Sequence, residues 1–150
     1  MKKREPGFTL VELLITLAIT GLIISVIGSA IYQLITVAEY GNDRLTATHE
    51  LENTAHWFSL DGQQASAASG GSGLVLTLPN RPSVTYSLVG TELRRTAGSA
   101  PMTLARNITG ASFSVAGRLV TMTLTSAPPG RWAVSEPGTY MVCLRAEEQE

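Results

Sequence analysis

The strongest constraint on the fold of this 150-residue chain is an apolar run that begins at Phe8 and ends at Ala38. Glu12 is the single charged residue in this run, so the 26 positions of residues 13–38 carry no formal charge. A helix of that length spans about 39 Å, whereas the hydrocarbon core of a bilayer is about 30 Å thick. The run is therefore long enough to cross a membrane as one helix.

The charges on either side of this run predict its orientation. Lys2, Lys3 and Arg4 precede it, and Glu39 and Asp43 follow it. Positively charged flanks remain on the cytoplasmic side of a membrane. We therefore expect the N-terminus to lie in the cytoplasm and residues 40 onward to lie outside the inner membrane.

Two ordinary interpretations of the run leave Glu12 unexplained. A secretory signal peptide could be cut after Ala30, because Gly28-Ser29-Ala30 has the small residues of such a site, but its apolar region would be unusually long and would contain a carboxylate. A plain membrane anchor would carry that carboxylate at a cost of about 2.5–3.5 kcal/mol at mid-helix and less near an end. A charged group kept inside a membrane segment indicates a function.

The stretch "GFTLVELLI", residues 7–15, resembles the signature of type IV prepilins and type II secretion pseudopilins. In this family a short basic leader ends in Gly, and a Phe, a Thr-Leu-x-Glu sequence and an apolar helix follow. Gly7 matches the last leader residue, Phe8 the first mature residue and Glu12 the glutamate at mature position five. The resemblance implies that a prepilin peptidase cuts between Gly7 and Phe8 and methylates the new amine of Phe8.

The resemblance also implies a role for Glu12, which in the family neutralises the N-terminal ammonium of a neighbouring subunit. A free α-amine has a pKa of about 7.7–8.0 and is largely charged at neutral pH. A charge pair in apolar surroundings fixes register, since removal of one partner leaves an uncompensated charge. Removal of a leader of residues 1–7 would change the formal net charge from −1 to −3.

Apolar residues continue at helical spacing beyond the membrane run, so residues 39–61 are predicted to extend the helix as an amphipathic segment. Trp57 and Phe58 are expected to anchor it to a head. Gly62 after Asp61 is a candidate C-cap. No proline occurs between Phe8 and Leu78, whereas many type IV pilins have a kinking proline in this helix. This departure from the family pattern favours a minor subunit.

The remaining chain predicts a small antiparallel head. Residues 62–73 are predicted to be a flexible linker, residues 74–146 the head and residues 147–150 an acidic tail. Gly90 and Ala116-Gly117 are predicted turns. A sheet packed on the amphipathic half of the helix would give an α+β, pilin-like fold. The expected strands are residues 74–78, 83–89, 91–95, 111–115, 118–125, 131–135 and 139–146.

The order of segments in the head resembles a particular branch of the family. The runs "VTYSLVGTELRR", "LARNITGASFSV" and "GRLVTMTLT" are similar to those of J-type minor pseudopilins, over about residues 74–125. Alternating strands look alike, so these runs are less specific than the N-terminal motif. Minor subunits of the family commonly prime assembly or occupy the tip of the filament.

No catalytic residues, metal site or cofactor site are predicted. His49 and His56 are seven residues apart and lack a third ligand, and Cys143 is the single cysteine, expected to be buried in a strand. Arg94 and Arg95 are expected to lie at a solvated strand edge, and an interaction patch is the alternative.

The sequence therefore indicates a structural subunit rather than an enzyme. The implied partners are a prepilin peptidase and methylase, other pilin or pseudopilin subunits through their N-terminal helices, and an inner-membrane assembly platform. Two other classes remain open: a soluble secreted enzyme cut after Ala30, and a competence or adhesion pilin that binds DNA or a surface. The formal net charge of −1 does not favour nucleic-acid binding. A basic patch for binding would have to come from Arg81, Arg94, Arg95, Arg106 and Arg118.

Overall fold

The computed structural model describes residues 9–146. Within this range the chain forms one long helix, α1 (Leu10–Gln64), and then a series of antiparallel strands. The chain divides into two compact units between Glu39 and Tyr40, so α1 contributes to both of them. The strands are β1 (Ala67–Ser69), β2 (Gly73–Thr77), β3 (Val84–Val89), β4 (Glu92–Ala97), β5 (Ala100–Ala105), β6 (Ile108–Ala116), β7 (Leu119–Ser126) and β8 (Glu136–Cys143).

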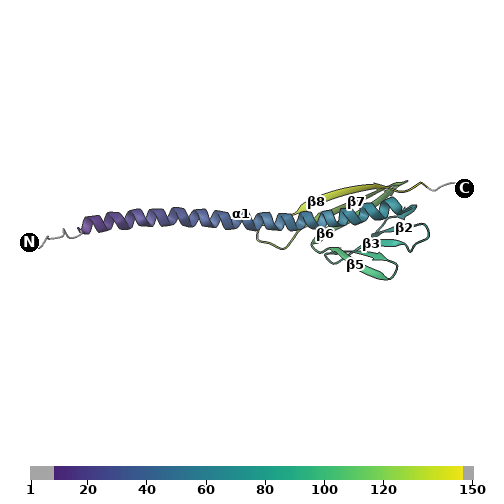
Figure 1. Ribbon diagram of the computed structural model, residues 1–150, viewed down its shortest axis with the longest axis horizontal. Coiled ribbons are helices and arrows are strands. Elements are labelled where there is room, and N and C mark those ends of the chain that lie inside the picture. The colour runs from purple at the N-terminus through teal and green to yellow at the C-terminus, as the bar shows by residue number, and fades with distance from the viewer. Residues whose placement is uncertain (1–8, 147–150) are drawn as a thin grey trace, which may run out of the picture. The chain divides into compact units, whose positions relative to one another are not determined.

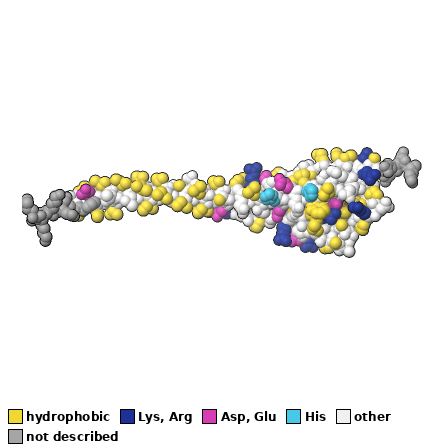
Figure 2. All heavy atoms as spheres, in the orientation of Figure 1, with side chains coloured by type: hydrophobic (Ala, Val, Ile, Leu, Met, Phe, Trp, Pro, Cys, Tyr) yellow, Lys and Arg dark blue, Asp and Glu magenta, His cyan; other side chains and the backbone are white. Residues whose placement is uncertain are grey.

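In the first unit, α1 exposes apolar side chains on every side. Consecutive residues such as Leu13, Leu14 and Ile15 are each more than half exposed, and successive residues of a helix point about 100° apart. Figure 2 shows the apolar side chains of this part on the face in view. A helix that is apolar all round requires lipid or other helices around it.

Four side-chain hydroxyl groups of this first part of α1 are bonded within the helix itself. The side-chain oxygens donate to backbone carbonyls three or four residues earlier, at 2.7–2.9 Å. A membrane interior offers no water to satisfy polar groups, so such internal bonds suit a membrane segment. The residues concerned are Thr16, Thr20, Ser25 and Ser29.

In the second unit, residues 40–64 of α1 bury one face. The buried positions recur at steps of three or four, which confirms the predicted amphipathic continuation. They are Ala47, Leu51, Thr54, Phe58, Asp61 and Gly62. Phe58 is only 1% exposed and Trp57 is half-buried against the core, so the predicted aromatic anchor is confirmed.

The strands form two antiparallel sheets, of five strands in the order β1-β2-β3-β4-β5 and of three strands in the order β6-β7-β8. The predicted turns are confirmed: Gly90 joins β3 to β4 and Gly117 joins β6 to β7, with φ of 64° and 61°. A β-branched side chain would be strained at such angles, whereas glycine adopts them freely. In Figure 1, β7 and β8 lie along one side of the last part of α1, and β2, β3 and β5 lie along the other.

One hydrophobic core joins the second half of α1 to both sheets. Leu51 and Phe58 of the helix share it with Tyr86 of β3, Met122 of β7 and Val142 of β8. Residues 9–146 therefore have the expected α+β arrangement, with a long N-terminal helix whose second part packs on antiparallel sheets.

Several boundaries differ from the prediction. The range 62–73, predicted to be a linker, contains β1, which pairs with β2. No strand was predicted at residues 100–105, which form β5. Its Pro101 is tolerated because β5 is an edge strand. The final predicted strand, residues 139–146, lies three residues earlier as β8.

The predicted strand at residues 131–135 is wrong. These residues form a loop in which Ala133 has a φ of 46°, outside the range of extended backbone. The loop is held against α1. A Cβ added at Gly130 would clash with the Asp43 carboxylate, and Glu136, which follows the loop, pairs with Arg44 at 2.9 Å. Contacts with the helix, rather than strand pairing, determine this segment.

Candidate functional site: the carboxylates of the long helix

Glu12 lies in the first turn of α1, directly after the helix begins. Its Oε2 accepts hydrogen bonds from the backbone N of Thr9 at 3.4 Å and from Thr9 Oγ1 at 3.3 Å. The backbone N of Glu12 in turn donates to Thr9 Oγ1 at 3.3 Å. This reciprocal arrangement is a capping box, which satisfies backbone donors that a helix N-terminus leaves unpaired.

The capping box was not predicted from the sequence, although the spacing Thr-x-x-Glu is its known signature. All three contacts are longer than the usual range for N–H···O or O–H···O bonds. Glu12 is also exposed to its surroundings. Its carboxylate is therefore held only loosely by its own helix, and an external cation could approach it.

The other N-terminal residues of the predicted processing site lie outside the described residues. They are the leader residues Lys2, Lys3 and Arg4, and the cleavage pair Gly7 and Phe8. Residues 147–150, the predicted acidic tail, also lie outside the described residues. Their roles stay predictions from the sequence.

Asp61, close to the other end of α1, is bound in a very different way. It is 4% exposed, and its two carboxylate oxygens accept a pair of hydrogen bonds from Arg95 of β4. Nε of Arg95 donates at 2.6 Å and Nη2 at 2.7 Å. The hydroxyl of Tyr86 on β3 also donates to Asp61. This cluster fixes the end of the helix to the centre of the five-stranded sheet.

Burial affects the ionisable groups of this cluster. Desolvation, and then the neighbouring Asp61 carboxylate, raises the pKa of the Tyr86 hydroxyl well above its usual range. The hydrogen bonds with Asp61 raise the pKa of Arg95 despite its partial burial. The Arg95 guanidinium lies 4.9 Å from the ring centroid of Trp57, which adds a cation–π contact.

The prediction that Arg94 and Arg95 lie at a solvated strand edge is therefore wrong. Their strand, β4, lies between β3 and β5. Arg95 is paired with Asp61, while Arg94 Nη2 pairs with Glu92 at 2.7 Å. The sequence could not identify this pairing, because 34 residues separate Asp61 from Arg95.

Glu50 forms a second link between α1 and the strands. Its carboxylate accepts bonds from Asn107 Nδ2 at 2.7 Å, from Ser126 Oγ at 2.9 Å and from the backbone N of Arg106 and Asn107 at 3.3 Å. These donors belong to the connection between β5 and β6 and to the end of β7. Glu50 thus joins the two sheets to one helical turn.

The histidines and the cysteine do not gather into a chemical site. Across residues 9–146 no group of three or more His, Cys, Asp or Glu side chains is placed to hold a metal ion. His49 lies 3.7 Å from Glu52 on the exposed side of α1. Cys143 is exposed on β8, so the prediction that it is buried is wrong. Its side chain lies on the outer face of the three-stranded sheet, beside the inward-facing Val142.

Comparison with known proteins bears on the N-terminal region alone. Residues 2–28 match the family model of the prokaryotic N-terminal methylation motif. No curated protein and no solved structure matches the chain. The match includes Glu12 and the predicted cleavage pair but ends before the head. It supports a type IV pilin-like or pseudopilin subunit, and no comparison supports the J-type assignment.

The motif match and the properties of α1 both indicate membrane anchoring. Within the described part of the chain, α1 is the one helix that is long and apolar enough to cross a membrane. Together they fit a single-pass, membrane-anchored protein that is processed by a prepilin peptidase and assembles with other pilin subunits. The motif and fold suggest a structural subunit rather than an enzyme.

Proposed function

We propose that this protein is a minor subunit of a type II secretion pseudopilus or a type IV pilus-like filament. The observation that carries this proposal is the combination of the methylation motif at residues 2–28 with an α1 whose first part is apolar on every side. In the membrane, lipid covers this surface. In a filament, the equivalent helices of other subunits cover it.

The proposed mechanism begins with processing. The basic leader keeps the N-terminus in the cytoplasm, and a prepilin peptidase cuts between Gly7 and Phe8 and methylates the Phe8 amine. Glu12 then accepts the ammonium of a neighbouring subunit. The long contacts of Glu12 with Thr9 support this exchange, because little is lost when the carboxylate leaves its own capping box.

The glycines of the first unit support close helix association. A Cβ added at Gly21 or Gly28 would meet nothing within 4 Å, so both positions are open. They are seven residues apart and therefore lie on one face of the helix. Small residues on a membrane helix allow neighbouring backbones to approach closely.

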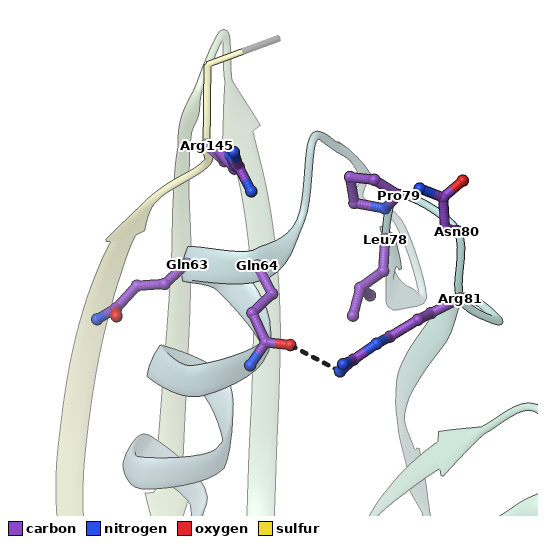
Figure 3. A pocket seen from close by; sticks show the side chains of 7 residues that line it. All are labelled: Gln63, Gln64, Leu78, Pro79, Asn80, Arg81 and Arg145. Atoms are coloured by element: carbon purple, nitrogen blue, oxygen red, sulfur yellow. Dashed lines mark hydrogen bonds between the residues drawn. The ribbon is translucent and has the colours of Figure 1, made fainter. Parts of the chain in front are cut away.

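The minor-subunit assignment rests on the missing proline and on the resemblance of the head to J-type pseudopilins. A role at the tip or in the initiation of assembly follows from the same resemblance, as does contact with an inner-membrane assembly platform. A DNA-binding pilin is less well supported. Four of its five candidate arginines are engaged by other groups of the second unit: Arg81 with Gln64 (Figure 3), Arg94 with Glu92, Arg95 with Asp61, and Arg118 with the carbonyl of Leu144.

The test of this function is the substitution Glu12→Ala. Processing should continue, so the mature chain should still begin at Phe8, as measured by intact mass and terminal peptide sequencing. Incorporation into sheared filaments should fall at least about tenfold, because the neighbour's ammonium would be left uncompensated in apolar surroundings. Glu39→Ala is the matched control, since it removes an acid from the same exposed helix without touching the motif.

Normal assembly of the Glu12→Ala protein would contradict the proposal. The N-terminus of the unsubstituted protein provides a second, independent criterion. A chain that begins at Phe8, especially with a methylated amine, supports the pilin pathway. A chain that begins at Ile31 would instead identify a conventional secreted protein cut after Ala30.

A further inference from the structure

The connection between β7 and β8 contains a tight turn that presents an aromatic side chain. The backbone N of Ala133 donates to the Gly130 carbonyl at 3.4 Å, which closes a β-turn with Arg131 and Trp132 at its two central positions. The Arg131 guanidinium lies 5.2 Å from the centroid of the Trp132 ring. The tip of this connection is therefore formed by an arginine and a tryptophan that contact each other.

This turn is held beside the first residues of the second unit. Gly130 lies directly against the Asp43 carboxylate, and Glu136, which follows the turn, pairs with Arg44 at 2.9 Å. Trp132 is two positions from Gly130, so the backbones of these two residues lie within about 7 Å of each other. Both sides of the turn are thus fixed to one turn of α1, which determines the level of Trp132 along the helix.

This level is close to the end of the membrane-length apolar run. Asp43 follows Ala38, the last residue of the run, by five positions, and α1 is helical throughout this stretch. Five residues of a helix rise about 7.5 Å, and the headgroup layer on each side of a bilayer is about 5–7 Å thick. The run is longer than the hydrocarbon core, and tilting of the helix accommodates such an excess. Burial of the whole uncharged run therefore places the turn at the level of the headgroups.

The side chains at this level have the chemistry of a membrane interface. Trp and Tyr are enriched among lipid headgroups, because each combines an apolar ring with one polar group. Trp132 is half-buried, and its Nε1 is enclosed without an acceptor among the described residues. Phospholipids offer phosphate and ester oxygens as acceptors once the ring turns outward. Tyr40 is 45% exposed and precedes Asp43 and Arg44 by three and four positions, so it lies on the same face of α1, nearer the apolar run.

We propose that the turn between β7 and β8 docks on the phospholipid headgroups of the membrane that α1 spans, with the Trp132 indole inserted among them. The partner is the lipid surface, and the ring rather than a cationic patch makes the contact, since Arg44 is already paired with Glu136. Docking holds the head against the bilayer until the subunit leaves the membrane. The proposal rests on membrane anchoring by α1 and not on filament assembly, so its failure would leave the role of Glu12 untouched.

The two tryptophans of the chain provide the test, because each can be observed alone. The full-length Trp57→Phe protein reports on Trp132, and the full-length Trp132→Phe protein reports on Trp57. Both side chains are half-buried, but Trp57 follows Asp43 by 14 positions and so lies about 21 Å farther along α1. Both proteins are inserted into vesicles of phosphatidylethanolamine and phosphatidylglycerol, with or without a phosphatidylcholine that carries a nitroxide on its headgroup.

The nitroxide should quench the fluorescence of Trp132 at least about threefold more strongly than that of Trp57, because only Trp132 lies among the headgroups. Quenching by acrylamide in the water phase corrects for any difference in exposure. Added salt should leave the ratio unchanged, since a contact made by the ring is not screened. Equal quenching of the two tryptophans, in protein that floats with the vesicles, overturns the proposal and would mean that the turn faces solvent or another subunit. Flotation shows in the same samples that α1 still anchors the chain.

A second measurement keeps both tryptophans in place. A fluorescent label on the exposed Cys143 reports on the far end of β8, seven residues and about 23 Å from Glu136. The same label on Pro129→Cys, an exposed position beside the turn, is used with Cys143→Ser so that it is attached only there. The headgroup nitroxide should quench the label at position 129 and leave the label at Cys143 almost unchanged. Equal quenching of the two labels would contradict docking through the turn.

Discussion

The two halves of α1 place a carboxylate in opposite situations. Glu12 lies in the half whose apolar side chains are exposed, and within residues 9–146 its carboxylate accepts hydrogen bonds only from Thr9, at 3.3–3.4 Å. Asp61 lies in the half that contributes to the core, and it is buried with Arg95 at 2.6–2.7 Å. Within the described residues, therefore, Asp61 has an ionic partner and Glu12 has none.

This difference indicates which carboxylate stabilises the fold and which is available for assembly. A buried charge without a partner is strongly destabilising, so Asp61 and Arg95 must fold together. Glu12 is exposed, so the fold of the single chain does not require a charged partner for it. Its partner, according to the proposed function, belongs to another subunit.

The largest expected effect is that of Asp61→Ala. This change leaves the guanidinium of Arg95, whose side chain is 15% exposed, without its ionic partner. The free energy of unfolding of the head should fall by about 3–5 kcal/mol. Urea denaturation of the full chain in micelles measures this loss, and Glu12→Ala in the same assay should change the unfolding of the head by less than about 0.5 kcal/mol.

A paired substitution tests whether the lost charge partner is the cause. Asp61→Leu combined with Arg95→Met replaces both charges with apolar groups, and it should cost clearly less than Asp61→Ala alone. An equal cost would mean that the shape of the cluster, rather than its charge, holds the helix to the sheet. A large effect of Glu12→Ala on the head would remove the contrast between the two halves.

The glycines of α1 allow a second comparison of its halves. A Cβ at Gly62 would clash with the side chain of Val142, whereas a Cβ at Gly28 would meet nothing within 4 Å. Gly62→Ala should therefore destabilise the head by about 2 kcal/mol through overpacking. Gly28→Ala should leave the urea midpoint of the head unchanged. A stabilised Gly62→Ala protein would show that β8 moves away from the helix at little cost.

The smallest expected effect concerns Tyr86. Because burial raises its pKa in the folded state, the folded protein keeps this proton at a pH at which the unfolded chain loses it. The free energy of unfolding should therefore fall as the pH rises above about 10, the ordinary value for tyrosine. Tyr86→Phe should cost about 1.5 kcal/mol at neutral pH and should reduce this alkaline decline.

Denaturation series between pH 8 and about 11 would check the alkaline prediction. Part of the decline should persist in the Tyr86→Phe protein, because burial also raises the pKa of Tyr140. An identical pH dependence of the two proteins would show that the Tyr86 proton does not contribute to stability.

The sequence predicted those features that depend on neighbouring residues. The apolar run, the helix up to Asp61, and the turns at Gly90 and Gly117 were identified from local patterns, and all are present. The N-terminal motif is similarly local, and its match to residues 2–28 is the one similarity found with known proteins. The capping box of Thr9 and Glu12 also depends on neighbouring residues, but it was not predicted.

The errors concern features that depend on distant parts of the chain. Gly62 was predicted to cap α1, but it lies inside the helix, where contact with Val142 excludes a larger side chain. The short strand β1 exists because β2 pairs with it, and residues 131–135 are a loop because they lie against α1. Such contacts cannot be predicted from the residue types of the segment alone.

The sequence by itself determined a membrane-length apolar helix with a carboxylate near its start, because hydrophobicity and helix periodicity act between neighbouring residues. Only the tertiary structure decided which charges are buried together and which side chains meet at the end of α1. Asp61 and Arg95 meet across 34 residues, and Gln64 and Arg81 across 17. Burial and charge pairing depend on distance in space, and folding alone brings these residues within reach of each other.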